Sequence, residues 1–411
     1  MNSHAGCTAA PPTIAVVGFS ARAAAQSAKR QGFEVVAVDL CADRDLLVEC
    51  RAHYRLDDPN WPDLLNSDYP NATLLLTGGM EHRSTWVERC HSQFVRAGAT
   101  GTQLRSMRNL ANWEKWAASS ELGWPRTISA ENLVSISIDS MRSSKWLIKN
   151  LESGGGTGTT DFEGQGLPQN LDRIYLQQRM LGETIGVTFL SSQVSCTFIG
   201  AMATWPPESN AIDKRYLYRG SYGPIPLSKT NIDKLQRFAA VAGRESGLLG
   251  VWQADFLLHE GELTLLEINP RWSASMDLLD ITLEMRLVEK HDASVRGMMT
   301  SSAMEQLASR AWEESLSSPE RMLGKLIVYA DQSCIISSAQ SEFWWSKRWN
   351  MDLLCELNRC RFADIPTVGT SIPAGGPILS VMATGSASES ILLALESAGS
   401  EVRSSSVSCH V

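Results

Sequence analysis

The first hundred residues alternate short apolar runs with segments of helical pattern, and this alternation constrains the fold more than any other feature. The apolar runs at 13–18, 34–39 and 73–79 are expected to form buried strands. The segment "ARAAAQSAKRQG" at 21–32 is expected to form a helix that Gly32 ends, and "EHRSTWVERCHSQFVRAG" after the third strand another. Strands that alternate with helices at this spacing predict a parallel, doubly wound sheet.

The turn after the first strand bears on the kind of nucleotide that such a sheet could bind. Its sequence, "GFSAR", lacks the G-x-G-x-x-G pattern of dinucleotide-binding sites. Asp39, at the end of the second strand, stands where such sites carry their ribose-binding acid. Without the glycines, a nicotinamide-dependent oxidoreductase is the weaker alternative.

Length and charge bound the organisation of the chain. Its 411 residues suffice for two or three domains. The pattern of expected strands and helices predicts an α/β domain over 1–104, a β-rich region over 105–300 and an α+β segment over 301–411. The formal net charge of −8 argues against nucleic acid and anionic membranes as partners. No apolar run approaches the roughly 20 residues that span a bilayer, and no secretory signal is recognised, so a cytoplasmic protein is expected.

The cysteines and histidines give no sign of metal or thiol chemistry. The nine cysteines are scattered without a C-x-x-C pair, as is typical of reduced, mostly buried thiols. The seven histidines form no H-E-x-x-H motif. Neither a zinc site nor a catalytic thiol is expected.

The later elements are predicted from the same patterns. A helix is expected over 109–122, and "SSAMEQLASRAWEESL" and "SASESILLALESAG" are expected to form two more. The runs "RMLGKLIVYA" and "PILSVMA" are expected to form strands. The serine-rich tail that follows the last helix is expected to be frayed.

A glycine-rich loop follows a short apolar strand at 145–159, "KWLIKNLESGGGTGT". The strand ends in Lys149, and the loop contains Gly154, Gly155, Gly156 and Gly158. Glycines let backbone N–H groups approach anionic oxygens, and a lysine beside them supplies positive charge for phosphates. No G-K-[ST] follows, so this is not a Walker loop. A surface hairpin with a solvated lysine is an equally open interpretation.

The segment "GVWQADFLLHEGELTLLEINP" at 250–270 is expected to form two strands joined at "HEGE". The period of two places Glu267 and Asn269 on one face, and a register centred on Gly261 places Asp255 opposite Glu267. Three oxygen ligands on one face suit Mg²⁺. A solvated acidic face is the alternative, and the flanking Leu, Ile and Phe residues disfavour it.

The order of these segments resembles the ATP-grasp superfamily. First comes a strand that ends in lysine, followed by a glycine-rich loop; then come "QQRMLGE" and "DF…EINPR". The stretch "EINPRWSAS" is the most specific part of the resemblance. The resemblance spans nearly the whole chain, and the N-terminal α/β domain is similar to the pre-grasp domain. It implies a carboxylate–amine ligase that uses ATP with Mg²⁺ or Mn²⁺, forms an acyl phosphate and releases ADP and phosphate. A non-catalytic nucleotide-binding or regulatory protein on the same scaffold is the alternative.

The resemblance implies roles for the nucleotide-binding residues. Lys149 would contact the α- and β-phosphates, and the loop of Gly154, Gly155 and Gly156 would cover the triphosphate. In the segment "IYLQQRMLGETIGVTFL", Gln178 would lie near the adenine and Glu183 near the ribose.

It also implies roles for the residues that would carry out the reaction. Asp255, Glu267 and Asn269 would hold the magnesium ions, and Arg271 would stabilise the acyl phosphate or the transferred phosphate. The segment "KRYLYRGSYGPIP" resembles the part that closes over substrate, with Arg219 as its candidate; a structural surface loop is equally open.

One feature departs from the superfamily pattern. Many members carry a lysine near the start of the helix that precedes "GxP", and here Arg108 stands near that place. Lys115 follows two turns later and is expected to be a solvated helix residue.

The C-terminal segment "RFADIPTVGTSIPAGGPILSVMATG" resembles the closing part of carboxylase-like ATP-grasp proteins. Together with "GGMEHR" at 78–83, it is most similar to ligases near the tyramine–glutamate ligase of methanofuran synthesis, in one-carbon metabolism. The implied partners are a small carboxylate, glutamate above all, and an aromatic amine; a homodimer is compatible with this. Trp344, Trp345 and Trp349 would line an aromatic pocket or, more commonly for tryptophan, a core or domain interface.

Overall fold

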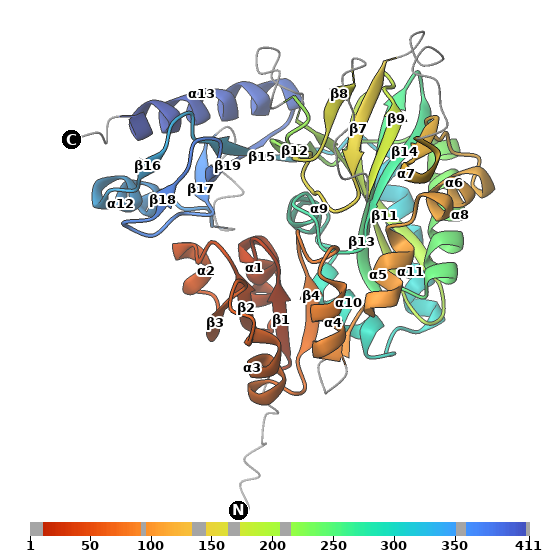
Figure 1. Ribbon diagram of the computed structural model, residues 1–411, viewed down its shortest axis with the longest axis horizontal. Coiled ribbons are helices and arrows are strands. Elements are labelled where there is room, and N and C mark those ends of the chain that lie inside the picture. Colours follow the sequence, from red (N-terminus) through yellow and green to blue (C-terminus); the bar gives the residue numbers. More distant parts are fainter. Residues whose placement is uncertain are drawn as a thin grey trace, which may run out of the picture.

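The computed structural model describes six stretches of the chain: residues 11–91, 96–133, 145–162, 173–205, 215–350 and 359–407. Their strands form a five-stranded, a four-stranded and an eight-stranded sheet and one two-stranded ribbon. The five-stranded sheet lies at the N-terminal end of the chain, and the other sheets lie beyond one end of its strands (Figure 1).

The five-stranded sheet is parallel, with the order β3-β2-β1-β4-β5, as the alternation of strands and helices predicts. Its strands are β1 (Thr13–Val17), β2 (Glu34–Asp39), β3 (Ala52–Arg55), β4 (Thr73–Leu76) and β5 (Arg96–Ala97). The strand order reverses between β1 and β4. In open α/β sheets, ligands bind beyond the carboxyl ends of the strands at such a reversal.

The helices around this sheet are α1 (Arg22–Arg30), α2 (Arg44–Leu47), α3 (Trp61–Asp68), α4 (Ser84–His91) and α5 (Gly101–Met107). The helix predicted after the third strand is shorter than expected. Arg96 and Ala97 pair in parallel with β4 instead, while residues 92–95 lie outside the described parts. A short apolar run can form either a helix or a strand, and here its pairing with the edge of the sheet makes it a strand.

The four-stranded sheet has the order β6-β9-β7-β8 and carries the glycine-rich loop between β7 and β8. Its strands are β6 (Thr127–Ser129), β7 (Trp146–Asn150), β8 (Thr160–Phe162) and β9 (Ile174–Gln178), and helices α6 (Leu110–Ser119) and α7 (Ala130–Leu133) flank β6 in the sequence. A small core formed by Trp146, Ile148 and Leu176, among others, holds the sheet together.

The eight-stranded sheet is antiparallel, in the order β14-β13-β10-β11-β12-β15-β19-β17. Its strands are β10 (Glu183–Ser191), β11 (Cys196–Thr204), β12 (Gly220–Gly223), β13 (Gly250–His259), β14 (Glu262–Asn269), β15 (Met322–Tyr329), β17 (Arg361–Ala363) and β19 (Pro377–Gly385). The C-terminal strands therefore extend the sheet that contains the predicted metal-binding hairpin. The domain boundaries after 104 and 300 stay predictions.

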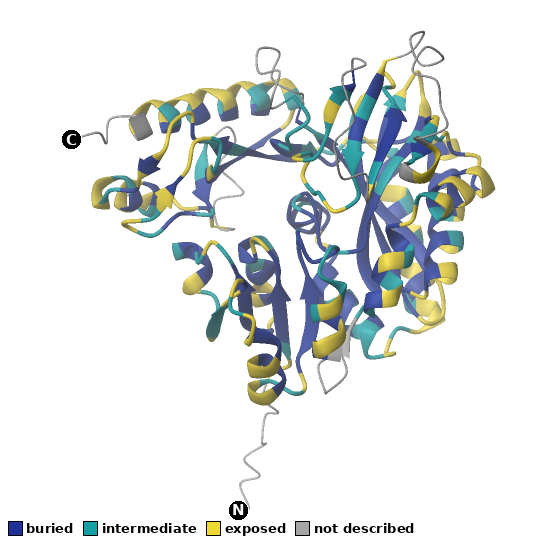
Figure 2. Cartoon of the chain, viewed as in Figure 1, coloured by how far each residue is buried: buried dark blue, intermediate teal, exposed yellow. Residues whose placement is uncertain are grey.

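The remaining elements are α8 (Lys229–Ser246), α9 (Met276–Leu283), α10 (Leu287–Val295), α11 (Ser301–Leu316), α12 (Ser338–Ser346), α13 (Ser388–Val407), and the ribbon of β16 (Cys334–Ile335) and β18 (Ser371–Ile372). Figure 2 shows buried strands in the sheets and helices that expose their outer faces. No helix in the described parts of the chain is both long and apolar enough to cross a bilayer.

The last helix, α13, corrects the expectation of a frayed serine-rich tail. It continues to Val407, because Leu395 and Val402 are buried in the C-terminal core. Packing of an apolar face stabilises a helix more than the intrinsic propensity of its residues does.

The C-terminal tryptophans lie in cores and at a contact between segments. Trp344 and Trp349 are buried, whereas Trp345 packs under the guanidinium groups of Arg44 and Arg348, which lie 4.3 and 4.5 Å from its ring centroid. The core or interface interpretation of these residues is therefore the one that the structure supports.

Candidate active site

The hairpin of β13 and β14 brings Asp255 opposite Glu267, which confirms the predicted pairing. The turn consists of Glu260 and Gly261, both with positive φ (50° and 83°), as in the two-residue turns common in hairpins. This turn alone would pair Asp255 with Leu266. A bulge between Asp255 and Phe256 shifts the register by one residue and thereby places Glu267 on the face of Asp255.

The side chains on this face form one hydrogen-bonded group. Nδ2 of Asn269 donates to Oδ2 of Asp255 at 2.9 Å and to Oε1 of Glu267 at 3.4 Å. Nε2 of Gln253 donates to Oδ1 of Asp255 at 2.9 Å, and Ser275 Oγ in turn donates to Oε1 of Gln253 at 2.8 Å. Nδ2 of Asn269 thus joins the carboxyl groups of Asp255 and Glu267. All three predicted metal ligands therefore lie together.

The two carboxyl groups differ in their electrostatic environment. Burial, and then the charge of Glu267, raise the pKa of Asp255 to about 7. Burial also acts to raise the pKa of Glu267, but attraction to Lys149 and Arg108 outweighs it, so the net pKa of Glu267 is lowered. A divalent cation would relieve the repulsion between two buried carboxyl groups that lie opposite each other, and hard oxygen ligands suit Mg²⁺.

Asn269 differs from its predicted role in one detail of orientation. Its Oδ1 accepts a hydrogen bond from Nη2 of Arg271 at 3.2 Å, while its NH₂ group faces the carboxylates. To ligate a metal through Oδ1, its amide would have to turn by half a rotation about the Cβ–Cγ bond. Asp255 and Glu267 need no such turn.

Arg271 is held in place by partners from two parts of the chain. Its Nε donates to Oε1 of Glu81 at 2.8 Å, and its Nη1 donates to Oγ of Ser273 at 3.0 Å. Its side chain is 11% exposed and that of Glu81 is fully buried. The guanidinium therefore lies beside the carboxylate group of β13 and β14 in a fixed direction.

Glu81 was not among the predicted site residues. It lies in the loop after β4, within "GGMEHR", at the carboxyl end of a strand beside the reversal of strand order. That position is the signal that could have found it. Burial acts to raise the pKa of Glu81, but attraction to Arg271 and then Arg108 lowers it to about 2.

Lys149 lies with the predicted metal ligands rather than in solvent. Its Nζ donates to Oε1 of Gln177 at 3.2 Å and lies 5.6 Å from the ring centroid of Tyr175. Burial acts to lower the pKa of Lys149, but attraction to Tyr175 and Glu267 raises it. These contacts argue against the solvated-lysine alternative.

The glycine-rich loop needs glycine where it packs against the chain before β12. Gly155 and Gly156 have positive φ, at 60° and 78°. A Cβ on Gly156 would lie 1.6 Å from the carbonyl oxygen of Tyr216, and the carbonyl of Gly155 accepts a hydrogen bond from the N–H of Tyr218 at 2.8 Å. A Cβ on Gly154 would lie 3.5 Å from Oε1 of Glu81, so the loop also contacts the N-terminal domain.

Arg108 and Lys115 differ in burial and in the groups that they contact. Arg108 is buried, and donates from Nη1 to the carbonyl of Ile268 at 3.1 Å and from Nη2 to that of Leu151 at 2.7 Å. Its Nε is buried with no hydrogen-bond partner in the described parts of the chain. Lys115 forms an ion pair of 2.8 Å with Glu245 at the surface. Only Arg108 is close enough to influence Glu81 and Glu267.

The remaining predicted site residues are Arg219, Gln178 and Glu183. Arg219 is buried, so a surface-loop role is wrong for it, and its carbonyl accepts a hydrogen bond from the N–H of Ile327 at 2.7 Å. Gln178 is half-buried at the end of β9. Glu183 is exposed and accepts a hydrogen bond from the hydroxyl of Tyr222 at 2.8 Å. The adenine and ribose roles stay predictions.

A sequence profile described as the ATP-grasp domain matches residues 114–275. No curated protein matches the chain. The fold is similar to an L-amino acid ligase from Bacillus licheniformis (TM-score 0.65, 12% identity, 97% of this chain and 98% of that one). It is also similar to a carboxyaminoimidazole ribonucleotide synthase from Aspergillus clavatus complexed with ATP (0.65, 13%, 96% and 99%).

A third similar structure is the biotin carboxylase domain dimer of the Hydrogenobacter thermophilus 2-oxoglutarate carboxylase, in complex with MgADP, ADP and bicarbonate. Its TM-score is 0.65 at 11% identity, over 91% of this chain and 86% of that one. The profile match and these similarities show that the chain has an ATP-grasp fold with an N-terminal parallel sheet.

Proposed function

We propose that this chain, whose residues 114–275 match the ATP-grasp domain, is an ATP- and Mg²⁺-dependent carboxylate–amine ligase. The observation that carries the proposal is the pair Asp255 and Glu267, which lie opposite each other on adjacent strands, are joined through Nδ2 of Asn269, and attract Lys149 and Arg271. The similar structures include an L-amino acid ligase and ATP or MgADP complexes, which supports the same class of reaction.

The reaction would join a carboxylate to an amine in two steps. The carboxylate oxygen attacks the γ-phosphorus of ATP, the bond to the β-phosphate oxygen breaks, and ADP leaves. The amine then attacks the acyl carbon, phosphate leaves with the electron pair of the C–O bond, and the amine loses a proton. Because positioning and charge neutralisation do most of this work, no covalent nucleophile of the protein is needed.

Each charged residue would have a defined part in this reaction. Asp255 and Glu267 would hold Mg²⁺, joined by Asn269 after its amide turns; Mn²⁺ also accepts such oxygen ligands. The bound ion supplies neutralisation of the triphosphate charge. Lys149 would donate to the α- and β-phosphates, and Arg271 would stabilise the charge on the acyl phosphate.

The remaining residues would bind and enclose the nucleotide. The backbone N–H groups of Gly154, Gly155 and Gly156 would cover the triphosphate, since glycine allows the closest approach. Gln178 and Glu183 would contact the adenine and the ribose. Arg219 would approach the substrate from the segment on which the glycine-rich loop packs.

The segments around 78–83 and 361–385 resemble those of tyramine–glutamate ligases, and this resemblance supports a proposal on the substrates. We infer that the carboxylate is that of a small amino acid, with glutamate first, and that the amine carries an aromatic group. A role in the biosynthesis of a one-carbon cofactor follows from the same resemblance.

The assembly and location of the protein complete the proposal. One similar structure is described as a dimer, and we infer a homodimer that acts in the cytoplasm on small molecules. Sedimentation of the purified chain would test the dimer.

The experiment that tests the activity is incubation with ATP, Mg²⁺ and a panel of glutamate, aspartate and alanine, with hydroxylamine as a small nucleophile. An acyl phosphate is intercepted as a hydroxamate, so ADP and hydroxamate are expected to rise together with glutamate. Tyramine, tyrosine and alkyl amines then test the acceptor. Nucleotide binding without ADP release for any carboxylate would favour a non-catalytic protein, and AMP as product would contradict the acyl phosphate.

A further inference from the structure

The loop after β4 carries a histidine that the reaction proposed above does not use. His82 follows Glu81 in a turn that is closed by a hydrogen bond of 3.0 Å from the N–H of Arg83 to the carbonyl of Met80. Met80 is fully buried and anchors the turn. The turn lies at the carboxyl end of β4, beside the reversal of strand order, where ligands of open α/β sheets bind.

One oxygen of Glu81 brings three parts of the candidate site together. Oε1 of Glu81 lies 2.8 Å from Nε of Arg271 and 4.0 Å from Nε2 of His82. A Cβ on Gly154 would lie 3.5 Å from the same oxygen. The imidazole, the guanidinium proposed to act on the acyl phosphate and the glycine-rich loop proposed to cover the triphosphate therefore meet around a single buried carboxylate.

The imidazole of His82 is available to exchange a proton with a substrate and with solvent. Its side chain is 16% exposed, and it makes no hydrogen bond in the described parts of the chain. At 4.0 Å, its approach to Glu81 is an electrostatic contact and not a hydrogen bond. The described chain therefore leaves the ring nitrogens of His82 uncommitted.

Four charged groups act on His82, and together with burial they keep its ring neutral. Burial lowers the pKa of His82, and attraction to Glu81 opposes this effect. Repulsion from Arg108 and then from Arg271 lowers the pKa further, whereas Glu152 acts to raise it. The net pKa lies below the ordinary value of 6.5, so the imidazole can accept a proton at neutral pH.

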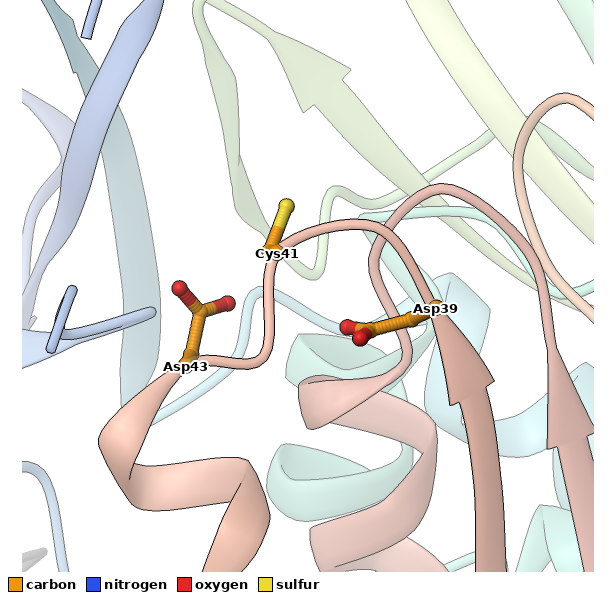
Figure 3. Close-up of side chains that lie close together, drawn as sticks. All are labelled: Asp39, Cys41 and Asp43. Atoms are coloured by element: carbon orange, nitrogen blue, oxygen red, sulfur yellow. The ribbon is translucent and has the colours of Figure 1, made fainter. Parts of the chain in front are cut away.

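Another histidine of the parallel sheet, His53 on β3, is already bound. Its Nε2 lies 2.8 Å from Oδ1 of the fully buried Asp39. Asp39 belongs to a group with Cys41 and Asp43 at the end of β2 and in the loop that follows (Figure 3). Asp39 also accepts a hydrogen bond of 3.0 Å from a backbone N–H of that loop, so it holds its own loop rather than a ribose. With a side chain 15% exposed, His53 is a control of similar burial.

We propose that His82 is the base that accepts a proton from the attacking amine in the second step of the reaction. This inference rests on the proposed ligase function and adds a catalytic residue to it. The lone pair of the amine nitrogen forms the N–C bond, and phosphate leaves with the electron pair of the C–O bond. The nitrogen becomes positively charged and its protons acidic, so one passes to a ring nitrogen of His82. The carboxylate of Glu81 stabilises the imidazolium, which releases the proton to solvent.

Two small nucleophiles separate this step from formation of the acyl phosphate, because neither needs an acceptor pocket. Once hydroxylamine has attacked, its nitrogen loses a proton readily to water, since the adjacent oxygen makes the N–H more acidic. Ammonia holds its proton more firmly and depends on a base. The full chain is incubated with ATP, Mg²⁺ and whichever of glutamate, aspartate and alanine gives the most hydroxamate. The rates of ADP, hydroxamate and amide formation are then measured.

The variant His82→Gln should slow amide formation from ammonia by about a hundredfold or more, as for the loss of a general base, and leave hydroxamate formation within about twofold. His53→Gln, whose amide can still donate to Asp39, should leave both rates within about twofold. A merely structural role of His82 would slow the reactions of both nucleophiles alike.

The dependence on pH gives a second measurement, which decides even if the variant does not fold. The ratio of the amide rate to the hydroxamate rate is followed at fixed concentrations of the two free bases. In the wild type this ratio should fall as the pH falls through a value below 6.5, because His82 becomes protonated there. The ratio should not depend on pH in His82→Gln. A ratio independent of pH in the wild type would overturn the proposal.

The remaining outcomes distinguish failure of this role from failure of the ligase. Equal loss of amide and hydroxamate in folded His82→Gln would overturn the role of base and assign His82 to formation of the acyl phosphate. Unchanged amide formation in the variant, or hydroxamate without amide in the wild type, would refute the base and leave the ligase intact. Absence of ADP and hydroxamate for every carboxylate in the wild type would refute the ligase and this role with it.

Discussion

Glu81 and Arg271, 190 positions apart in the sequence, form an ion pair in which Nε of Arg271 lies 2.8 Å from Oε1 of Glu81. The pair joins the loop after β4 of the N-terminal domain to the end of β14 in the ATP-grasp domain. The other oxygen of Glu81 is buried and has no hydrogen-bond partner in the described part of the chain. The N-terminal domain therefore contributes directly to the position of the guanidinium proposed to act on the acyl phosphate.

Replacing Glu267 with Gln is expected to abolish turnover and preserve the fold. The change keeps the shape of the side chain and removes one charge from the proposed metal site, so the rate of ADP release should fall by at least about a hundredfold. Glu262→Gln is the matched control, because Glu262 lies on the same strand but pairs with Lys234 at the surface. ADP release by folded Glu267→Gln at the wild-type rate would contradict the metal assignment.

Lys149→Met removes the ammonium group and keeps the aliphatic stem. The affinity for ATP should fall by about 1.5–3 kcal/mol, as for a hydrogen bond to a charged group. Calorimetry with the β,γ-imido analogue of ATP measures this loss, and Lys115→Met, which removes only a surface ion pair with Glu245, should leave the affinity unchanged. Equal affinities of the two variants would argue that Lys149 does not contact the phosphates.

Gly156→Ala should weaken nucleotide binding because its Cβ would collide with the carbonyl of Tyr216. The collision would displace the glycine-rich loop from the segment before β12. Gly369→Ala is the control for backbone strain, since Gly369 also has a positive φ (84°) but no atom within 4 Å of an added Cβ. Weaker binding of the ATP analogue is expected in the first variant only. Equal effects would mean that positive φ, rather than loop packing, matters.

The pair of Glu81 and Arg271 should make stability depend on acid. The pKa of Glu81 is lowered from 4.5 in the unfolded chain to about 2 in the folded one. Its contribution to the free energy of unfolding, about 3 kcal/mol, is therefore complete above pH 4.5 and lost as the pH falls from 4.5 towards 2.

Urea unfolding of wild type and Glu81→Gln at pH 6 and pH 3 measures this contribution. The variant should be less stable than wild type at pH 6, and the difference should shrink at pH 3. Glu88→Gln, at a half-exposed position that pairs with Arg105, should show little change at either pH. A difference that is the same at both pH values would contradict the assignment of the low pKa to Glu81.

The parallel sheet and the acidic hairpin were predictable because their signals are local. Strand and helix periods repeat within windows of ten to twenty residues, and the two arms of a hairpin lie close in sequence. The pairing of Asp255 with Glu267 was nevertheless predicted from a simple register about Gly261, whereas the structure reaches it through a two-residue turn and a bulge. Bulges depend on the packing of both strand faces, which a pattern of residues does not reveal.

The sequence by itself determined which residues can carry chemistry: Lys149 at a strand end before glycines, and Asp255, Glu267 and Arg271 around a strand that is otherwise apolar. Only the tertiary structure decided their partners. Glu81 reaches Arg271 from the loop after β4, and Arg22 of α1 pairs with Asp364, 342 positions away. The physical reason is that burial sets the energy of each charge, and burial depends on which distant segments pack together.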